Sequence, residues 1–460
     1  MISALLDSFA AQNPRCPVLI DARTTISAHD ASGLVAELAE QIKRRKQDRV
    51  YFYAANSAHL ILGVIATEAA GLQCCILNRQ SPREELVTLL DRLGAGLFVT
   101  DSNVAVPAAQ GVLLDDLARA AQERPRLKSH SVSKEQPGTI VVLTTGTTGL
   151  PKAAQYTWDR LLGKIPAREG ANGKQWLLAY PLNHFAGLQV LLAALRDQCT
   201  LVIPEASDFR TVIDSLIRHE VECVSGTPTF WRMLAARITD EDAQRLKLEQ
   251  ITLGGEASDE QLLKKLKSRF PSAAITQVYA TTEAGTCFAV KDGRPGFPAS
   301  YLHRRVGNVE LKIVDGELFV RSSVSMIGYV AEADTMGEAE NWRATGDLVE
   351  QSGDRIFFRG RKTEVINVGG VKVHPLKVEE TVLRVPGVSA VRVYGAPSPI
   401  TGQIVACDIE VEEGAIADTV REMTQSACAK SLTRYEQPRQ LRIVDRLERR
   451  NEKLVRRRNG

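Results

Sequence analysis

The segment VVLTTGTTGLPK, residues 141–152, places threonines, glycines and one lysine between an apolar run and a segment with a helical pattern. Threonine hydroxyls and backbone N–H groups donate hydrogen bonds, glycine lets the backbone approach a ligand closely, and lysine adds a positive charge. These groups together suit a chain of phosphates. The candidate phosphate-binding residues are Thr144, Thr145, Gly146, Thr147, Thr148, Gly149 and Lys152.

The spacing of this loop differs from both common nucleotide-binding patterns. A Walker loop would need glycine before the lysine, where this chain has Pro151, and no G-x-G-x-x-G fingerprint is present. Taken alone, a hexamer rich in glycine and threonine is more often an ordinary turn. Other segments of the chain must therefore decide between a turn and a phosphate site.

The elements around the loop predict an α/β body. Strand-like runs such as 49–55 and 74–78 alternate with helix-patterned segments such as 58–71, and the alternation recurs from 176 to 228. This order is typical of parallel sheets covered by helices. From about residue 305 the pattern changes to alternating strands with Asp-Gly and Gly-Asp turns, which indicates an antiparallel region.

The last hundred residues predict a smaller α+β unit, a size within the normal range for a domain. We therefore expect an α/β fold with a large N-terminal body, residues 1–360, followed by a small α+β unit, residues 361–460.

Composition sets limits on the partners. The 460 residues carry a net charge of +3, with 44% hydrophobic and 25% charged residues, so a globular protein without a nucleic-acid partner is expected. Apolar stretches are too short for a membrane span, and the N-terminus lacks a basic leader, which predicts a cytoplasmic protein with no membrane partner. The eight cysteines lack metal-binding spacing and are expected to be reduced thiols.

Further segments follow the loop in a fixed order: VYATTEAG at 278–285, WRATGDL at 342–348, RGRKTEVINVGGVKVHPLKVEE at 359–380, and a lysine near the C-terminus. With the loop, this series resembles the adenylate-forming superfamily of acyl-CoA synthetases, adenylation domains and luciferases, in the style of bacterial aryl- and acyl-CoA ligases. The resemblance covers essentially the whole chain and implies that residues 1–360 bind ATP and an acid, while residues 361–460 form a mobile lid that carries the catalytic lysine. It implies that a carboxylate attacks the α-phosphorus of ATP, pyrophosphate leaves, and the acyl-adenylate passes to a thiol.

The resemblance also implies roles for single residues. Thr282 matches a phosphate contact, and Glu283 matches the carboxylate that holds Mg²⁺, a cation that prefers oxygen ligands. Tyr279 matches the aromatic that stacks on adenine. The complete set expected to hold adenosine is Gly255, Glu256, Tyr279, Asp347 and Arg361, the last two on the ribose hydroxyls.

Two lid segments are assigned in the same way. Lys453 matches the catalytic lysine that bridges the carboxylate and the α-phosphate during adenylation. Gly369, Gly370 and Lys372 match the loop that enters the site for thioester formation. Both assignments imply that the lid turns between the two half-reactions.

Three positions depart from the usual pattern of the superfamily. Ala280 and Glu452 stand where glycine is common, and Thr363 occupies the hinge position, where aspartate or lysine is usual. These departures leave open a second hypothesis, a catalytically silent nucleotide-binding regulatory protein.

The segment YPLNHFAGLQVLLAAL, residues 180–195, resembles the acyl- and aryl-CoA ligase form of this region, with His184 at the pocket histidine. It lacks the aspartate that would pair with the ammonium of an amino acid, and a buried unpaired ammonium is costly. We therefore expect a small carboxylic acid, aromatic or cyclic, as substrate. The thiol acceptor is expected in trans, most simply CoA, and the phosphopantetheine of a carrier protein remains the alternative.

Overall fold

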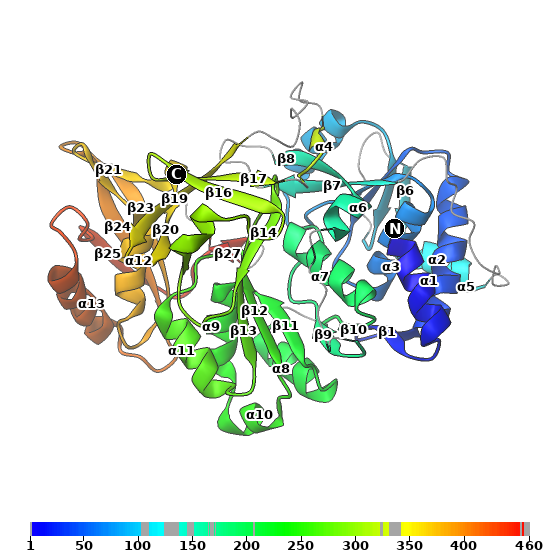
Figure 1. The fold of residues 1–460 in the computed structure, drawn as a ribbon, viewed down its shortest axis with the longest axis horizontal. Coiled ribbons are helices and arrows are strands. Elements are labelled where there is room, and N and C mark those ends of the chain that lie inside the picture. Colours follow the sequence, from blue (N-terminus) through cyan, green and yellow to red (C-terminus); the bar gives the residue numbers. More distant parts are fainter. Residues whose placement is uncertain are drawn as a thin grey trace.

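The structure, a computed structural model, describes residues 2–102, 110–123, 138–144, 151–163, 165, 170, 172–205, 208–322, 325–330, 342–450 and 453–454. Its described part contains four large sheets and one terminal hairpin. Two of these sheets, with their helices, make up most of the N-terminal part of the chain (Figure 1).

The first sheet has seven strands with a parallel centre. In order across the sheet they are β18 (Gly328–Tyr329), β8 (Lys152–Thr157), β7 (Thr139–Thr144), β4 (Gln73–Ile76), β3 (Arg49–Tyr53), β5 (Leu97–Thr100) and β6 (Gln110–Leu113). Neighbours from β7 to β6 run parallel, whereas β8 lies antiparallel to both β7 and β18. Four helices accompany this sheet: α2 (Ala28–Lys43), α3 (Ala58–Ala69), α4 (Arg83–Leu93) and α5 (Leu114–Gln122).

The two faces of the first sheet belong to different cores because side chains alternate along each strand. On β3, Val50 and Phe52 join a large core that includes α2, α3 and α5, while Tyr51 and Tyr53 join a smaller core under α4. Every residue of α3 except His59 is buried, which agrees with its largely apolar sequence. Helices therefore cover both faces of the sheet, as predicted for an α/β body.

The second sheet has eight strands and supplies most of the candidate site. Across the sheet the order is β14 (Gly285–Val290), β13 (Ala274–Thr281), β12 (Gln250–Gly254), β11 (Cys223–Gly226), β9 (Gln175–Leu177), β10 (Thr200–Val202), β1 (Pro17–Ile20) and β2 (Thr25–Ser27). Its outer edge strands β14 and β2 are antiparallel to their neighbours, and the strands between them pair in parallel.

Helices again lie on both sides of this sheet. One side packs on the large core with α1 (Ile2–Gln12), α6 (Trp158–Leu162) and α7 (Phe185–Arg196), and so faces the first sheet across α7. The other side packs against α8 (Phe209–Arg218), α9 (Pro228–Arg237), α10 (Asp240–Arg245) and α11 (Glu260–Arg269).

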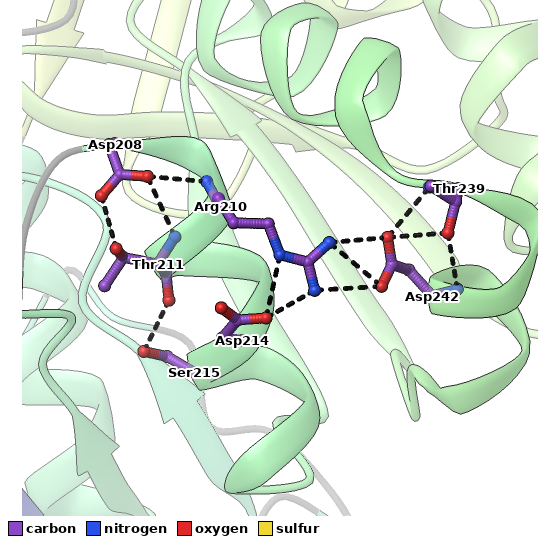
Figure 2. Close-up of polar contacts among 7 residues, drawn as sticks. All are labelled: Asp208, Arg210, Thr211, Asp214, Ser215, Thr239 and Asp242. Carbon is purple, nitrogen blue, oxygen red and sulfur yellow. Dashed lines mark hydrogen bonds and ion pairs between the residues drawn. The ribbon is translucent and has the colours of Figure 1, made fainter.

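A charged cluster ties α10 to α8 at the surface of the second core (Figure 2). The Arg210 guanidinium lies 2.5 Å from Oδ1 of Asp214 and 3.2 Å from Oδ2 of Asp242. Asp242 also accepts hydrogen bonds from the backbone N–H and hydroxyl of Thr239, which completes a capping box at the start of α10. This cluster stabilises the short helix.

The third sheet is antiparallel, as the strand pattern after residue 305 predicts. Its order is β15 (Phe297–Pro298), β20 (Arg355–Arg361), β19 (Arg343–Ser352), β17 (Glu317–Ser322) and β16 (Val309–Val314), with a 3-10 turn at Ala299–His303. The two-residue turn Asp315–Gly316 joins β16 to β17, and both residues have positive φ. Such a conformation suits the right-handed twist of a hairpin.

The fourth sheet belongs to the C-terminal unit. It contains β22 (Val371–Val373), β21 (Ile366–Val368), β24 (Gly402–Val411) and β23 (Val388–Ser398), and β25 (Gln440–Val444) pairs with β24. A 3-10 turn at Lys362–Glu364 precedes it, and the helices are α12 (Pro375–Leu383) and α13 (Ala417–Ser431). A hairpin of β26 (Arg449–Arg450) and β27 (Lys453–Leu454) follows. The predicted α/β fold, with parallel sheets, an antiparallel region and an α+β C-terminal unit, is confirmed.

The eight cysteines are free thiols, and seven of them are buried. Burial raises the pKa of the Cys75 thiol to about 12, so this group stays protonated at neutral pH. Among the described residues, every helix is too short or too polar to cross a lipid bilayer.

Candidate active site

A cavity of about 1790 Å³ lies between the second sheet, the third sheet and α12. It brings together residues that are far apart in the sequence and that the sequence analysis assigned to one site. These are Thr144, Lys152, His184, Gly255, Glu256, Tyr279, Thr282, Glu283, Asp347 and Arg361. The convergence follows from topology, because parallel strands β12 and β13 end at the same edge of the sheet.

Tyr279, Asp347 and Arg361 form a connected polar group on one wall of the cavity. The Tyr279 hydroxyl donates a hydrogen bond of 2.6 Å to Oδ2 of Asp347, and Nε of Arg361 lies 2.9 Å from Oδ1 of the same carboxylate. Strand register brings Asp347 and Arg361 together, because Asp347 on β19 pairs directly with Arg361 on β20. The predicted ribose-binding pair is thus preassembled.

Burial sets the protonation of this group. It raises the pKa of Asp347, and the Arg361 charge together with the Tyr279 hydrogen bond acts against that rise. Burial, with the neighbouring Asp347 carboxylate, raises the pKa of Tyr279 well above its usual value. Tyr279 therefore stays a hydrogen-bond donor at neutral pH.

The ring of Tyr279 belongs to an aromatic wall that the sequence analysis missed. Its centroid lies 5.1 Å from that of Phe288 and 4.9 Å from that of Phe358, and both pairs are stacked. Phe288 and Phe358 also line the cavity. The aromatic pair in RIFFRGR on β20 was the available signal, but only the pairing of β20 with β19 brings it to Tyr279.

Glu283 and Lys152 approach one another across a second tyrosine. Oε1 of Glu283 accepts a hydrogen bond of 3.0 Å from the Tyr329 hydroxyl, and Nζ of Lys152 lies 4.8 Å from the centroid of the Tyr329 ring. The Thr282 carbonyl accepts a hydrogen bond from Tyr156, which fixes the backbone beside Glu283. Tyr156 and Tyr329 are thus positioning residues that the sequence analysis did not single out.

The carboxylate of Glu283 fits the predicted magnesium role by its chemistry. It is an oxygen donor at the cavity wall, and only one of its two oxygens has a hydrogen-bond partner among the described residues. A hard cation such as Mg²⁺ takes carboxylate oxygen together with phosphate oxygens and water. Lys152, on the other side of Tyr329, supplies a positive charge for the same phosphates.

Gly255 and Glu256 follow β12 at the cavity wall. Gly255 has φ of +83°, a backbone conformation that favours glycine. The Glu256 carboxylate accepts hydrogen bonds from the backbone N–H of Thr229, at 3.0 Å, and from its hydroxyl, at 2.7 Å. Glu256 therefore also caps the first turn of α9.

His184 stands at the N-cap position of α7, where the chain leaves the 180–184 loop. Two contacts fix this loop. The Tyr180 hydroxyl donates to the Gly254 carbonyl at 3.2 Å, and the Asn56 side chain bonds the backbone of both Tyr180 and Leu182 at 2.9 Å. The loop thus connects the ends of strands from both large sheets at the cavity wall.

The C-terminal unit meets the cavity through α12, β23 and Glu448, which directly precedes the terminal hairpin. Figure 1 shows this hairpin near the centre of the molecule. Lys453 pairs with Arg450 in the hairpin backbone, and its side chain lies outside what the structure describes, as does Glu452. The predicted loop residues Thr145, Gly146, Thr147, Thr148 and Gly149 also lie outside the described residues.

Gly369, Gly370 and Lys372 lie apart from the cavity lining in the described arrangement. Gly369 and Gly370 form the turn between β21 and β22 with φ of +59° and +92°. The Gly369 N–H donates to the Thr401 carbonyl and the Gly370 N–H to Oδ1 of Asn367. In this arrangement Glu448, just before the terminal hairpin, lines the cavity, whereas the described residues of this turn do not.

Comparison with known proteins agrees with this geometry. The AMP-binding enzyme family matches residues 6–330, and the C-terminal domain of AMP-binding enzymes matches residues 377–453. A 2-succinylbenzoate–CoA ligase of Bacillus subtilis is 25% identical over 96% of this chain and 93% of its own. A feruloyl-CoA synthase of an Amycolatopsis species is 26% identical, with 95% and 94% covered.

Solved structures show the same fold. An anthranilate CoA ligase in complex with anthranoyl-AMP has a TM-score of 0.85 at 17% identity, covering 99% of this chain and 95% of its own. An o-succinylbenzoate coenzyme A synthetase of Bacillus subtilis, in complex with ATP and magnesium ion, has a TM-score of 0.77 at 23% identity, with 98% of each chain covered.

These names agree with the predicted enzyme class, an AMP-forming acid–thiol ligase, and with ATP, Mg²⁺ and CoA as its cofactors. The family match extends over well more than half of the sequence. The chain therefore belongs to the AMP-binding enzyme family.

Proposed function

We propose that the protein activates an aromatic or cyclic carboxylic acid with ATP and Mg²⁺ and transfers the resulting acyl group to CoA. The observation that carries this proposal is one cavity that joins the Tyr279–Asp347–Arg361 group, Glu283 and the α7 wall beside His184. Such a cavity can hold a nucleotide and an acid next to each other, and holding two reactants in contact removes much of the cost of their meeting.

The nucleotide end of the reaction rests on fixed polar groups. Asp347 accepts hydrogen bonds from ribose hydroxyls, and the Arg361 charge acts against the rise in the pKa of this carboxyl that burial causes. Thr282 and Lys152 face the phosphates. Bound Mg²⁺, held by Glu283, would offset the negative charge of the triphosphate.

The acid end rests on the loop that carries His184 and on α7. The segment 180–195, which carries His184, contains no aspartate or glutamate. A substrate with a charged ammonium group would therefore lack a partner in this segment. Several related proteins are named for aromatic or cyclic acids, among them succinylbenzoate, ferulate and anthranilate. The first observation argues against an acid with an ammonium group, and the second supports an aromatic or cyclic acid.

For the lid we propose the division into residues 1–360 and 361–460 and a rotation between the half-reactions. The C-terminal core draws its buried residues from 366 to 432 alone, which supports an independently packed unit. We also propose a cytoplasmic location, which the free, buried thiols support.

CoA is expected to be the acceptor. With ATP, Mg²⁺ and a panel of aryl and cyclic acids, addition of CoA should yield AMP and one acyl-CoA in equal amounts, detected by mass spectrometry. The control omits the acid. If an adenylate forms, CoA leaves it intact and a holo-carrier protein takes the acyl group, then the acceptor is the phosphopantetheine of a carrier protein.

Asp347→Asn should weaken ATP binding by roughly tenfold to a hundredfold, because a buried charged acceptor is lost and Arg361 keeps an uncompensated charge. Isothermal titration calorimetry with ATP measures the effect. Asp91→Asn, at an exposed position on α4, is the matched control and should bind ATP as the parent protein does. Equal affinity in both variants would remove Asp347 from the nucleotide site.

A further inference from the structure

Three hydroxyls form a row across the second sheet on the side that faces the cavity. Ser225 on β11 is in register with Thr252 on β12, and Thr252 is in register with Thr276 on β13. These strands lie side by side in Figure 1. All three residues line the cavity and are more than nine-tenths buried. We call Ser225, Thr252 and Thr276 the hydroxyl row.

The O–H groups of the two threonines in the hydroxyl row are available as hydrogen-bond donors. Nε2 of Gln250 donates to the oxygens of Thr252, at 3.2 Å, and Thr276, at 3.1 Å. The same nitrogen donates to the Ile251 carbonyl, so the amide must present its N–H groups on this side. Because both threonine oxygens already accept a hydrogen bond, their own O–H groups remain as donors.

Ser225 adds a third donor. Only 5% of the residue is exposed, and its hydroxyl is open to the cavity, because Ser225 lines it and its oxygen is not among the enclosed unpartnered atoms of the described residues. A hydroxyl that opens into a cavity can donate to a ligand or to water there. The hydroxyl row thus offers three hydroxyl donors, in register on neighbouring strands, to an acceptor oxygen in the cavity.

The opposite wall is apolar. Val190 and Ala193 of α7 line the cavity, together with Ile165 and Trp176. The hydroxyl row lies far from Thr282 along the strand, because five steps of β13 lead from Thr276 to Thr281, roughly 16 Å at the rise of a strand. An acid activated beside Thr282 would therefore reach the row only with its far end.

We infer that the hydroxyl row selects an acid whose distal ring carries an uncharged acceptor oxygen, a ketone or a hydroxyl. This inference rests on the proposed function and names its substrate class. The row offers neutral donors only, and a buried carboxylate would need a paired cation. Lys291 is an exposed cation in the cavity lining, directly after Val290, which pairs with Gln277 of β13, so replacing it tests whether the distal group is charged.

Matched acids test the inference. One pair is 8-(4-oxocyclohexyl)octanoate and 8-cyclohexyloctanoate, and another is 8-(4-hydroxyphenyl)octanoate and 8-phenyloctanoate, because these chains are long enough to carry the ring from Thr282 to the row. The parent protein should bind and activate the oxygenated acid of each pair at least about tenfold better than its partner. An acid without the distal oxygen would leave the donors of the row unpaired. Calorimetry gives the affinities, and acid-dependent AMP release gives kcat/KM.

Variants assign the preference to the row. Thr252→Val and Ser225→Ala should reduce the ratio of kcat/KM between the oxygenated and the oxygen-free acid of each pair toward one. For the oxygen-free acid, kcat/KM should stay within about twofold of the parent value. Thr88→Val, at an exposed position on α4, should leave both values unchanged. Circular dichroism and ATP affinity confirm that each variant is folded.

Several results would overturn the inference. One is equal binding of both members of every pair, and another is an equal loss for both acids in the row variants. A third is that the parent protein prefers acids with a distal carboxylate and that Lys291→Met abolishes this preference. That result would show that the distal group of the substrate is anionic. If the acids are activated without any such preference, only the inference about the hydroxyl row is wrong. If the acids bind but no AMP forms, the proposed function is wrong.

Discussion

Lys453→Ala is expected to abolish most acid-dependent pyrophosphate exchange, by about a hundredfold or more, while thioester formation from synthetic acyl-adenylate stays within a few-fold of the parent rate. In the first half-reaction two negative groups, the carboxylate and the α-phosphate, must approach one another. A cation between them offsets their repulsion as charge develops on phosphorus. In the second half-reaction the adenylate already exists, so the lysine is not needed.

The arrangement of the C-terminal unit is the reason to expect this separation. Glu448 lines the cavity, and the hairpin that carries Lys453 follows it, while Gly369 and Gly370 lie in a turn elsewhere. A lid that rotates would exchange these two segments. Gly370→Trp should therefore do the reverse, with exchange preserved and thioester formation lost.

The two half-reactions must be measured on both variants with the same acid. Lys430→Ala, at an exposed position on α13, is the matched control for loss of one lysine and should leave both rates unchanged. Equal losses in the two halves for Lys453→Ala would contradict the lid rotation. An unchanged rate in both would mean that the lysine has no part in the chemistry.

Glu283→Gln should slow adenylation by roughly a hundredfold, since one charged contact at a phosphoryl centre typically contributes that much. The glutamine oxygen can still accept the hydrogen bond of Tyr329, so the change removes charge more than shape. Raising the Mg²⁺ concentration should restore part of the rate, because the variant holds the metal more weakly. Stopped-flow or quench measurement of acid-dependent AMP formation provides the rates.

Two controls separate the metal role from stability. Glu413→Gln, at an exposed position after β24, should leave the rate and its Mg²⁺ dependence unchanged. Tyr329→Phe removes the hydrogen bond to Oε1 and should cost less than Glu283→Gln, because the charge remains. A Glu283→Gln variant with the parent rate at low Mg²⁺ would exclude this carboxylate as the metal ligand.

Local motifs were enough to predict several of the residues that meet in the cavity. Tyr279 and Glu283 belong to one short segment, and Asp347 and Arg361 to two others, and their types and order carried the assignment. The α/β alternation likewise predicted sheets covered by helices, because strand and helix periods are visible in short windows.

Contacts that depend on long-range register could not be predicted in this way. Tyr329 meets Glu283 because β18 pairs with β8 at the edge of the first sheet. The hydroxyl row is also invisible in the sequence, since Ser225, Thr252 and Thr276 are single polar residues in three apolar strands. Only the in-register pairing of those strands brings the three hydroxyls together.

The central claim is that this protein converts a carboxylic acid to an acyl-adenylate, and acid-dependent exchange of labelled pyrophosphate into ATP tests it most directly. The account predicts exchange that requires both Mg²⁺ and an aromatic or cyclic acid, and that is lost in Lys453→Ala. A protein that binds ATP by calorimetry but shows no exchange with any acid of the panel would contradict it, and would identify the chain as a catalytically silent nucleotide-binding protein.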